Sequence, residues 1–312
     1  MPDVDLEKDV IYGDAGNRPL KLNIFRPSTP NGAAVVLAHG GGWSRGSKDA
    51  VGPAATALAQ QGFVVLAQEY RLTGEAPFPA NIHDVKRAIR WAKQHAADLR
   101  FDPERLCLEG HSAGAHLVLL AAGTPDDARL APPEGLGGVS QAVAAVCAIY
   151  PPTRFHFAGA RPSGSLPASV LPGADASEAA AALASPIEHV TAAFPPVMLL
   201  HGDADKVVPV SASRRFEERV RAVGGKVDLH VYAGLPHGFA NHPEIRPAMM
   251  SMIGGFFRRW AIAPEVFAPP APRPEAAVRT ESPANRLRGS SGGWPNRYPS
   301  PREAGRGPPK AG

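Results

Sequence analysis

The fold of this chain is decided by residues 106–116, which read Leu106-Cys107-Leu108-Glu109-Gly110-His111-Ser112-Ala113-Gly114-Ala115-His116. An apolar run of strand type at residues 106–108 leads into a Gly-x-Ser-x-Gly motif, and a segment of helical type at residues 115–122 follows it. On such a sharp turn, small neighbours let the strained backbone close tightly and hold the serine hydroxyl up from the sheet. Because strand and helix stand on the required sides, the motif predicts Ser112 to be a nucleophile in an α/β protein.

Short runs rich in Val, Ile and Leu alternate with longer amphipathic segments along most of the chain. This alternation is typical of βα units around a mostly parallel central sheet with helices on both faces. Ahead of the first core strand, residues 10–12 and 20–25 are expected to form an antiparallel edge ribbon around a turn at 13–17. The expected core strands are residues 33–38, 63–67, 106–109, 142–149, 197–200 and 227–232, and the expected helices are residues 53–61, 81–97, 113–123 and 211–223.

The domain organisation is predicted to be one folded domain at residues 1–264 and a disordered tail at residues 265–312. The tail holds ten Pro and six Gly with few large apolar groups, so it cannot bury enough surface to offset its ordering entropy. Residues 151–186 are rich in Pro, Gly, Ser and Ala and interrupt the alternation of strands and helices. They are expected to form a small flap over the sheet, with a short helix at residues 178–183.

The distribution of charge, the segments that could direct export and the cysteines indicate which partners and which cellular compartment to expect. The net charge of +4 arises in the tail, which has seven Arg and one Lys against four Glu and leaves 25 basic and 25 acidic residues in positions 1–264. A neutral folded part gives no reason to expect nucleic acid as a partner. No secretory signal and no membrane span are recognisable. Cys107 and Cys147 lie in apolar runs typical of buried free thiols, so a cytoplasmic location is expected.

A glycine-rich loop follows the strand at residues 33–38 and reads His39-Gly40-Gly41-Gly42-Trp43. Ligands bind at the carboxyl ends of strands in open α/β sheets, and consecutive glycines can turn their N–H groups toward a developing oxyanion. We expect the amides of Gly41, Gly42 and Ala113 to form an oxyanion hole, and Trp43 and His111 to contact the substrate. A Gly-rich turn without a catalytic role or a phosphate loop is the alternative, but no Lys-Ser/Thr or GxGxxG pattern follows.

A serine nucleophile needs a base, and His237 is the candidate among eleven histidines. It follows the last expected strand, which satisfies the chain order serine, acid, histidine of this architecture. The acid is expected on the loop after residues 197–200, where Asp203 and Asp205 compete. We assign the acid to Asp205 and expect Asp203 to bond the backbone of its own turn.

With HGGGW at residues 39–43, GHSAGAH at 110–116, HGDADKVVP at 201–209 and PHGF at 236–239 in this order, the chain resembles the α/β-hydrolase superfamily. Within it, the likeness is to esterases related to hormone-sensitive lipase and to bacterial acetyl and feruloyl esterases, over roughly residues 5–260. The resemblance implies Ser112 as nucleophile, Asp205 as acid, His237 as base and the loop at 39–42 as oxyanion hole.

Two departures refine this resemblance. Relatives of hormone-sensitive lipase commonly carry Asp where this chain has His111, which is instead found in the smaller acetyl and feruloyl esterases and in enzymes like kynurenine formamidase. Such relatives also place a helical cap before the first core strand, whereas this chain has only the expected ribbon there. The departures imply an open, lightly capped site.

The sequence therefore predicts a serine carboxylesterase that hydrolyses small or short-chain carboxylic esters through a covalent acyl-enzyme. A small-molecule ester is the expected partner, and no metal or cofactor is expected. An amidase of the same fold, either an aryl formamidase or a small peptidase, is the alternative because the same residues serve both reactions. An inactive binding protein on a hydrolase scaffold usually lacks a triad member, and none is missing here.

Overall fold

The computed structural model describes residues 3–16, 18–134, 137–159 and 161–267 of the chain. Within these residues an eight-stranded sheet has the order β1-β2-β4-β3-β5-β6-β9-β10. The core pairs are parallel, while β1 pairs with β2 and β2 with β4 in antiparallel orientation, which confirms the predicted fold class. The strands are β1 (Val4–Asp14), β2 (Pro19–Pro27), β3 (Ala34–Ala38), β4 (Val64–Gln68), β5 (Leu106–His111), β6 (Ala145–Ile149), β9 (Val197–Gly202) and β10 (Val227–Tyr232).

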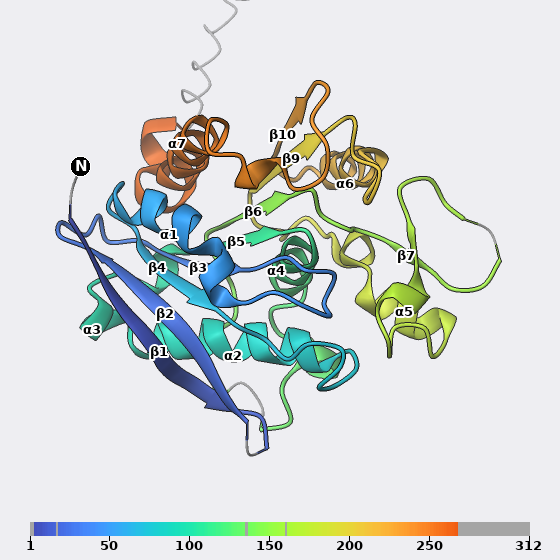
Figure 1. Ribbon diagram of the computed structural model, residues 1–312, viewed down its shortest axis with the longest axis horizontal. Helices are drawn as coiled ribbons and strands as arrows, with labels where there is room; N and C mark the ends of the chain where they lie inside the picture. The colour runs from blue at the N-terminus through green and yellow to red at the C-terminus, as the bar shows by residue number, and fades with distance from the viewer. Residues whose placement is uncertain (1–2, 17, 135–136, 160, 268–312) are drawn as a thin grey trace, which may run out of the picture. The chain divides into compact units, whose positions relative to one another are not determined.

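Helices cover both faces of the sheet, as Figure 1 shows. One apolar core joins the sheet to α2, α4 and α6, and a second core on the other face joins it to α1 and α7. Strand residues alternate between the cores, as Val36 does with Leu37, so core strands are apolar on both faces. Among the described helices none is long and apolar enough to cross a membrane. The α-helices are α1 (Gly52–Ala59), α2 (Ala80–Gln94), α3 (Ala96–Leu99), α4 (Ala113–Gly123), α5 (Glu178–Ala184), α6 (Ser211–Ala222) and α7 (Arg246–Phe257).

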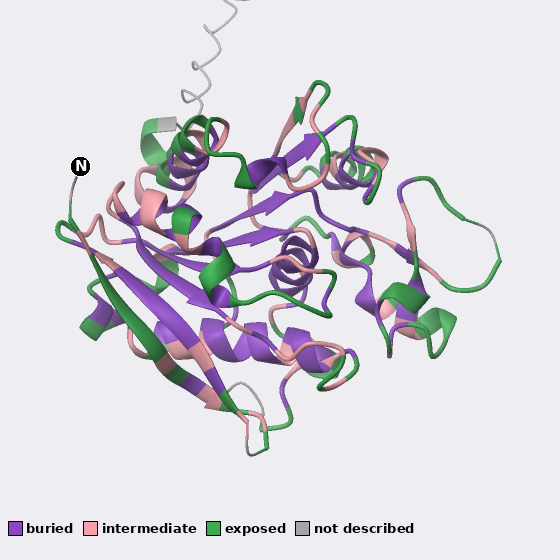
Figure 2. Cartoon of the chain, viewed as in Figure 1, coloured by how far each residue is buried: buried purple, intermediate pink, exposed green. Residues whose placement is uncertain are grey.

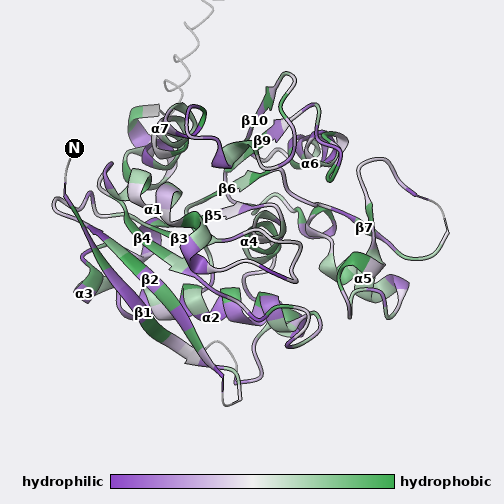
Figure 3. Ribbon diagram, in the orientation of Figure 1, coloured by the Kyte–Doolittle hydropathy of each residue, from purple (hydrophilic) through white to green (hydrophobic). Residues whose placement is uncertain are grey.

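The edge ribbon is longer than the sequence indicates, because β1 begins at Val4 and β2 ends at Pro27. The register of β1 shifts between Glu7 and Val10, and Asp9 has a positive φ of 59°. Such a bulge interrupts the alternation of apolar and polar residues on which strand prediction depends. Figure 2 shows β1 largely exposed beside buried core strands, and Figure 3 shows hydrophilic and hydrophobic residues mixed along it.

Helix α7 was not among the expected helices. It carries Pro247 in its first turn and Gly254-Gly255 near its end, and glycine weakens the helical signal. The structure gives a packing reason for one of these glycines, because a Cβ on Gly254 would lie 2.1 Å from Oε1 of Gln61. α7 also packs against α1, and Nε2–H of Gln61 donates to the Met250 carbonyl at 3.0 Å, so contacts that the sequence does not reveal stabilise this helix.

The segment predicted as a flap contains two short strands and a helix. Strands β7 (Phe155–His156) and β8 (Leu166–Pro167) pair with each other, and α5 closely matches the helix expected at residues 178–183. The segment is attached to the main body by hydrogen bonds: the Phe78 amide donates to the Pro172 carbonyl at 2.8 Å and the Thr153 hydroxyl donates to the Ala212 carbonyl at 3.0 Å. These hydrogen bonds attach the segment at residues 151–186 to the rest of the folded domain.

Deleting residues 268–312 is expected to leave the melting temperature and ester turnover essentially unchanged. Of the tail predicted at residues 265–312, only residues 265–267 are described, and they belong to a short 3-10 turn at Pro264–Phe267; the rest lies outside the described residues. The buried members of both apolar cores lie between Tyr12 and Ala261. Calorimetry and an ester assay on the full and shortened chains check this, and a large loss in either quantity would contradict it.

Candidate active site

Ser112 stands at the turn between β5 and α4 with a φ of 52° and a ψ of −114°. Such a backbone is strained for a residue with a side chain. The turn requires glycine on both sides, because a Cβ on Gly110 would lie 2.5 Å from the Gly114 carbonyl and a Cβ on Gly114 would lie 2.2 Å from the Ala38 oxygen. The two glycines thus let the turn pack against β3 while the serine side chain projects from the end of the sheet.

Three residues selected from the sequence meet at this turn. Ser112 Oγ lies 2.9 Å from Nε2 of His237, and Nδ1 of His237 lies 2.6 Å from Oδ2 of Asp205. Since a carboxylate can only accept, Nδ1–H donates to Asp205, and Nε2 is left to accept a proton from the serine hydroxyl. The Asp205 carboxyl is fully buried, whereas the His237 side chain is 19% exposed at the pocket.

Asp205 is held by more groups than the imidazole. Its Oδ1 accepts the amides of Val207 at 2.8 Å and Val208 at 2.9 Å, and its Oδ2 lies 3.3 Å from Nε2 of His201. Burial alone would raise the pKa of Asp205, but the hydrogen bonds from His201, His237 and the two amides outweigh it and hold the pKa well below its usual range. The site therefore contains a buried anion that can stabilise a positive charge on His237.

Asp203 was expected to bond its own turn, and the structure corrects this expectation. Its Oδ1 accepts the Gly234 amide at 2.6 Å, while its own amide donates to the Tyr232 carbonyl at 3.1 Å. The parallel pairing of Gly202 with Tyr232 brings the two strand ends together, so Asp203 reaches the loop after β10. It is Asp205 that accepts amides of its own turn, and Asp203 fastens the loop that carries His237.

The glycine-rich loop lies directly against the Ser112 turn. Gly41 and Gly42 have positive φ values of 125° and 59°, and a Cβ on Gly40 would lie 3.4 Å from the Ser112 Cβ. A Cβ on Gly41 would lie 2.0 Å from the Arg45 carbonyl oxygen, so a side chain there is excluded. In the described chain the amides of Gly41 and Gly42 donate to no protein acceptor. They are free donors beside the serine.

The loop is braced by Tyr70, which follows β4. The His39 ring stacks on the Tyr70 ring at 4.4 Å, and the Tyr70 hydroxyl donates to the His39 carbonyl at 3.0 Å. The Thr73 amide donates to the Trp43 carbonyl at 2.8 Å. The segment after β4 thus fixes both ends of the glycine run.

Trp43, expected to contact the substrate, points away from the pocket. Its side chain is buried, its Nε1–H donates to Nδ1 of His116 at 3.1 Å, and its ring packs against Phe155. Because Nδ1 of His116 accepts, Nε2–H donates to the Ala184 carbonyl at 2.7 Å. Burial lowers the pKa of His116 to about 4, which favours this neutral form. Trp43 therefore anchors the loop to α4 and the flap segment.

The pocket over Ser112 has a volume of about 310 Å³. His111 lines it, with its largely buried ring placing Nε2 3.3 Å from Oε1 of Glu109, and its expected contact with substrate stays a prediction. No group of three or more His, Cys, Asp or Glu side chains in the described residues could hold a metal ion. Besides the glycine loop, Ser112 and the His237-Gly238 pair, the lining comprises Arg45, Ala50, Val51, His111, Tyr150, Val207 and Asn241.

Two residues near the site were not selected from the sequence. Tyr150 follows β6 with a positive φ of 43°, and its ring lies 4.5 Å from the His237 ring. Glu109 is fully buried in β5, where its Oε2 has no partner among the described residues. The sequence contained a hint of each residue. Tyr150 directly follows an expected core strand, and Glu109 is a charged residue within an otherwise apolar strand.

Comparisons with known proteins agree with this geometry. The BD-FAE family model matches residues 22–220. The probable carboxylic ester hydrolase LipM of Mycobacterium tuberculosis is 35% identical over 75% of this chain and 55% of its own length, and esterase LipQ of the same organism is 32% identical over 78% and 59%. The chain thus spans little more than half the length of these curated relatives.

Solved structures show the same fold at nearly full coverage. The apo form of Thermogutta terrifontis esterase 2 has a TM-score of 0.69 and 28% identity over 86% of this chain and 96% of that one. A truncated carbohydrate esterase from gut microbiota has a TM-score of 0.69 and 27% identity over 82% and 95%. The chain therefore belongs to the BD-FAE family, among the serine esterases of the α/β-hydrolase superfamily.

Proposed function

We propose that this protein is a serine carboxylesterase that hydrolyses small or short-chain carboxylic esters through a covalent acyl-enzyme. The observation that carries the proposal is the continuous chain from Ser112 Oγ to His237 and Asp205, with distances of 2.9 and 2.6 Å, beside two unengaged glycine amides. The names of the relatives, which include ester hydrolases and esterases, support the same reaction class.

In acylation, Ser112 Oγ attacks the ester carbonyl carbon while Nε2 of His237 takes the hydroxyl proton. The carbonyl oxygen becomes an oxyanion, toward which the amides of Gly41, Gly42 and Ala113 are proposed to donate. The Asp205 carboxylate stabilises the imidazolium that forms. His237 then returns the proton to the departing alkoxide, so an alcohol leaves and the acyl group remains on Ser112.

In deacylation, a water molecule replaces the alcohol and gives one proton to His237 as its oxygen attacks the acyl carbon. The same amides receive the second oxyanion. Collapse of this intermediate breaks the bond to Ser112 Oγ, which recovers its proton from His237 as the carboxylic acid leaves. Each cycle consumes one ester and one water, and it needs no redox partner.

Small substrates are favoured by the pocket itself. Its volume of about 310 Å³ lies at the lower end of the range for ligand sites, roughly 300 to 1,000 Å³. An extended acyl chain would therefore find little apolar wall beyond Ala50, Val51, Val207 and the Tyr150 ring.

The test is a panel of p-nitrophenyl acetate, butyrate and decanoate together with an aryl formamide. We expect the short esters to be hydrolysed with the highest kcat/KM and Ser112→Ala to abolish the turnover. Ser169→Ala, which changes an exposed serine outside the pocket lining, serves as the matched control. A preference for decanoate or for the formamide would contradict the substrate class, and full activity of Ser112→Ala would contradict the mechanism.

We also infer a reducing compartment, the cytoplasm. Cys107 and Cys147 are free and buried on adjacent strands, where burial raises the pKa of both thiols and keeps them unreactive. Recovery of the native protein from the secreted or membrane fraction of its source cells would contradict this location.

A further inference from the structure

We propose that Arg45 recognises an anionic group on the substrate, so that the preferred esters carry a free carboxylate a few bonds from the ester carbonyl. Half-esters of short dicarboxylic acids are the simplest members of this class. The inference rests on the proposed esterase activity and names the substrate class of the same pocket.

The position of Arg45 is set by the glycine-rich loop. Its amide donates to the Gly41 carbonyl at 3.2 Å, and its own carbonyl occupies the space that a Cβ on Gly41 would need. The turn is closed further at Gly46, where a Cβ would lie 2.4 Å from the Gly40 oxygen. One tight turn therefore carries both the proposed oxyanion donor and the guanidinium, which fixes where the side chain leaves the backbone.

Arg45 lines the pocket that contains Ser112 and forms no ion pair with any described residue. Several other arginines of the folded part are engaged, for example Arg71 with Asp84 and Arg154 with Glu188. An exposed guanidinium without an acidic partner keeps all its N–H donors for a ligand.

Acidic groups near the pocket are already occupied or turned away. Asp205 is fully buried and bound to His237, and Glu109 is buried behind His111. Asp49, the nearest acid in sequence, accepts a hydrogen bond from Nδ2 of the Asn23 side chain at 2.8 Å and lies 3.8 Å from Nζ of Lys48. The pocket lining contains no carboxylate, so an anionic substrate meets one cation there and no fixed negative charge.

The chemistry of the side chain selects the ligand. A guanidinium presents a planar fork of N–H donors that matches a carboxylate at two points, whereas a neutral ester offers only weak acceptors. The side chain is exposed, so water and salt screen the attraction and we expect a discrimination of roughly tenfold. Because the anion lies outside the reacting bond, the gain should appear in KM more than in kcat.

The experiment compares ethyl hydrogen succinate with ethyl 4-oxopentanoate, in which a methyl group replaces one carboxylate oxygen. Ethanol release is measured at a pH where the succinate carboxyl is ionised, and the readout is the ratio of kcat/KM for the charged ester to that for the neutral one. For the unmodified chain we expect a ratio of roughly ten, falling several-fold at an ionic strength of about 1 M, where the Debye length is about 3 Å.

Three variants complete the test. Arg45→Gln should bring the ratio close to one, and Arg45→Lys should give an intermediate ratio because it keeps the charge without the fork. Arg214→Gln, which removes an exposed arginine on α6 outside the pocket lining, should leave the ratio unchanged. Melting temperatures show that each variant is folded.

The outcomes separate the two proposals. A ratio that is the same in the unmodified chain, Arg45→Gln and Arg214→Gln, with both esters hydrolysed, overturns the role of Arg45 and leaves the esterase intact. Absence of hydrolysis for both of these esters and for the p-nitrophenyl panel overturns the esterase proposal and the role of Arg45 with it. If Arg45→Gln does not fold, the salt dependence of the ratio in the unmodified chain decides.

Discussion

Asp205→Asn is expected to keep the fold and to lower turnover by roughly 10⁴-fold, as loss of the anion does in the serine protease triad. The Val207 and Val208 amides need an acceptor, so the amide oxygen of the new side chain stays at the Oδ1 position. Its NH2 group then replaces Oδ2 and faces Nδ1 of His237, which must accept. The ring proton moves to Nε2, and His237 can no longer accept the proton of Ser112.

The matched control is Asp203→Asn, the same chemical change two residues earlier. Its amide oxygen can still accept the Gly234 amide, so we expect turnover within about tenfold and a loss of stability of about 1 kcal/mol. Steady-state kinetics and thermal melts on both variants check the pair. If Asp203→Asn lost turnover by orders of magnitude while Asp205→Asn kept it, the two aspartates would have to exchange roles.

The predictable parts of this site are those that depend on local sequence. The expected helix at residues 113–123 and the expected strand at 227–232 coincide with α4 and β10, because their patterns are uninterrupted. The strand-turn-helix order around Ser112 and the chain order of the three side chains likewise follow from short-range patterns. These positions need no knowledge of how distant segments pack.

What the sequence could not supply is contact between distant segments. The Trp43 side chain is buried because it hydrogen-bonds to His116 and packs against Phe155. Asp203 accepts the Gly234 amide because β9 and β10 pair in parallel. Similarly, α7 forms despite its glycines because it packs against α1. In each case a partner far away in sequence outweighs the local preference.

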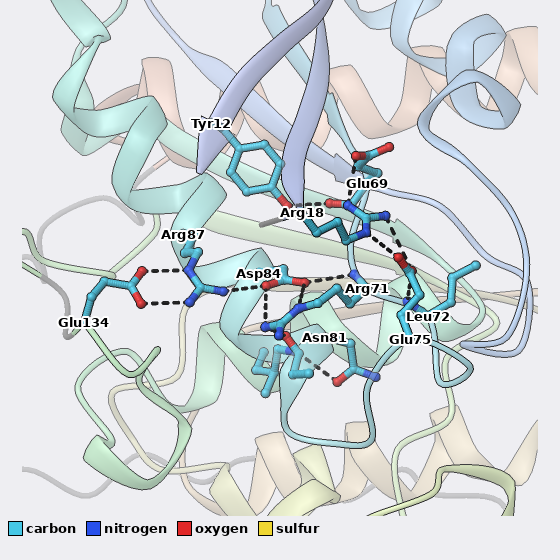
Figure 4. A network of polar contacts seen from close by, with 12 residues as sticks. Tyr12, Arg18, Glu69, Arg71, Leu72, Glu75, Asn81, Asp84, Arg87 and Glu134 are labelled. Atoms are coloured by element: carbon cyan, nitrogen blue, oxygen red, sulfur yellow. Dashed lines mark hydrogen bonds and ion pairs between the residues drawn. The ribbon is translucent and has the colours of Figure 1, made fainter. Parts of the chain in front are cut away.

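A network of polar side chains shows how such contacts support the site (Figure 4). The fully buried Asp84 of α2 accepts the Arg71 amide at 2.8 Å, Nε of Arg71 at 2.9 Å and Nη1 of Arg87 at 2.6 Å. Arg87 in turn donates to both carboxylate oxygens of Glu134 at 2.6 and 2.7 Å. The network fixes the residue that follows Tyr70, and Tyr70 braces the loop at His39.

Asp84→Ala is expected to lower the free energy of unfolding by about 3 to 5 kcal/mol. The loss is large because Arg71, whose side chain is only 16% exposed, loses its carboxylate partner, while Arg87, whose side chain is 5% exposed, keeps Glu134 alone. Without Asp84 the Arg71 backbone also loses its acceptor, so the segment that holds the glycine loop should loosen and kcat should fall in the variant that still folds.

Urea unfolding of Asp84→Ala and Glu218→Ala provides the measurement and its control. Glu218 pairs with Arg215 on α6, where the two side chains are 63% and 56% exposed, so its removal should cost less than about 1 kcal/mol. An equal, small effect of both substitutions would mean that the buried network contributes no more than a surface pair. A large loss confined to Asp84→Ala would show that the buried network stabilises the fold. If kcat also falls in that variant, the network supports the glycine-rich loop beside Ser112.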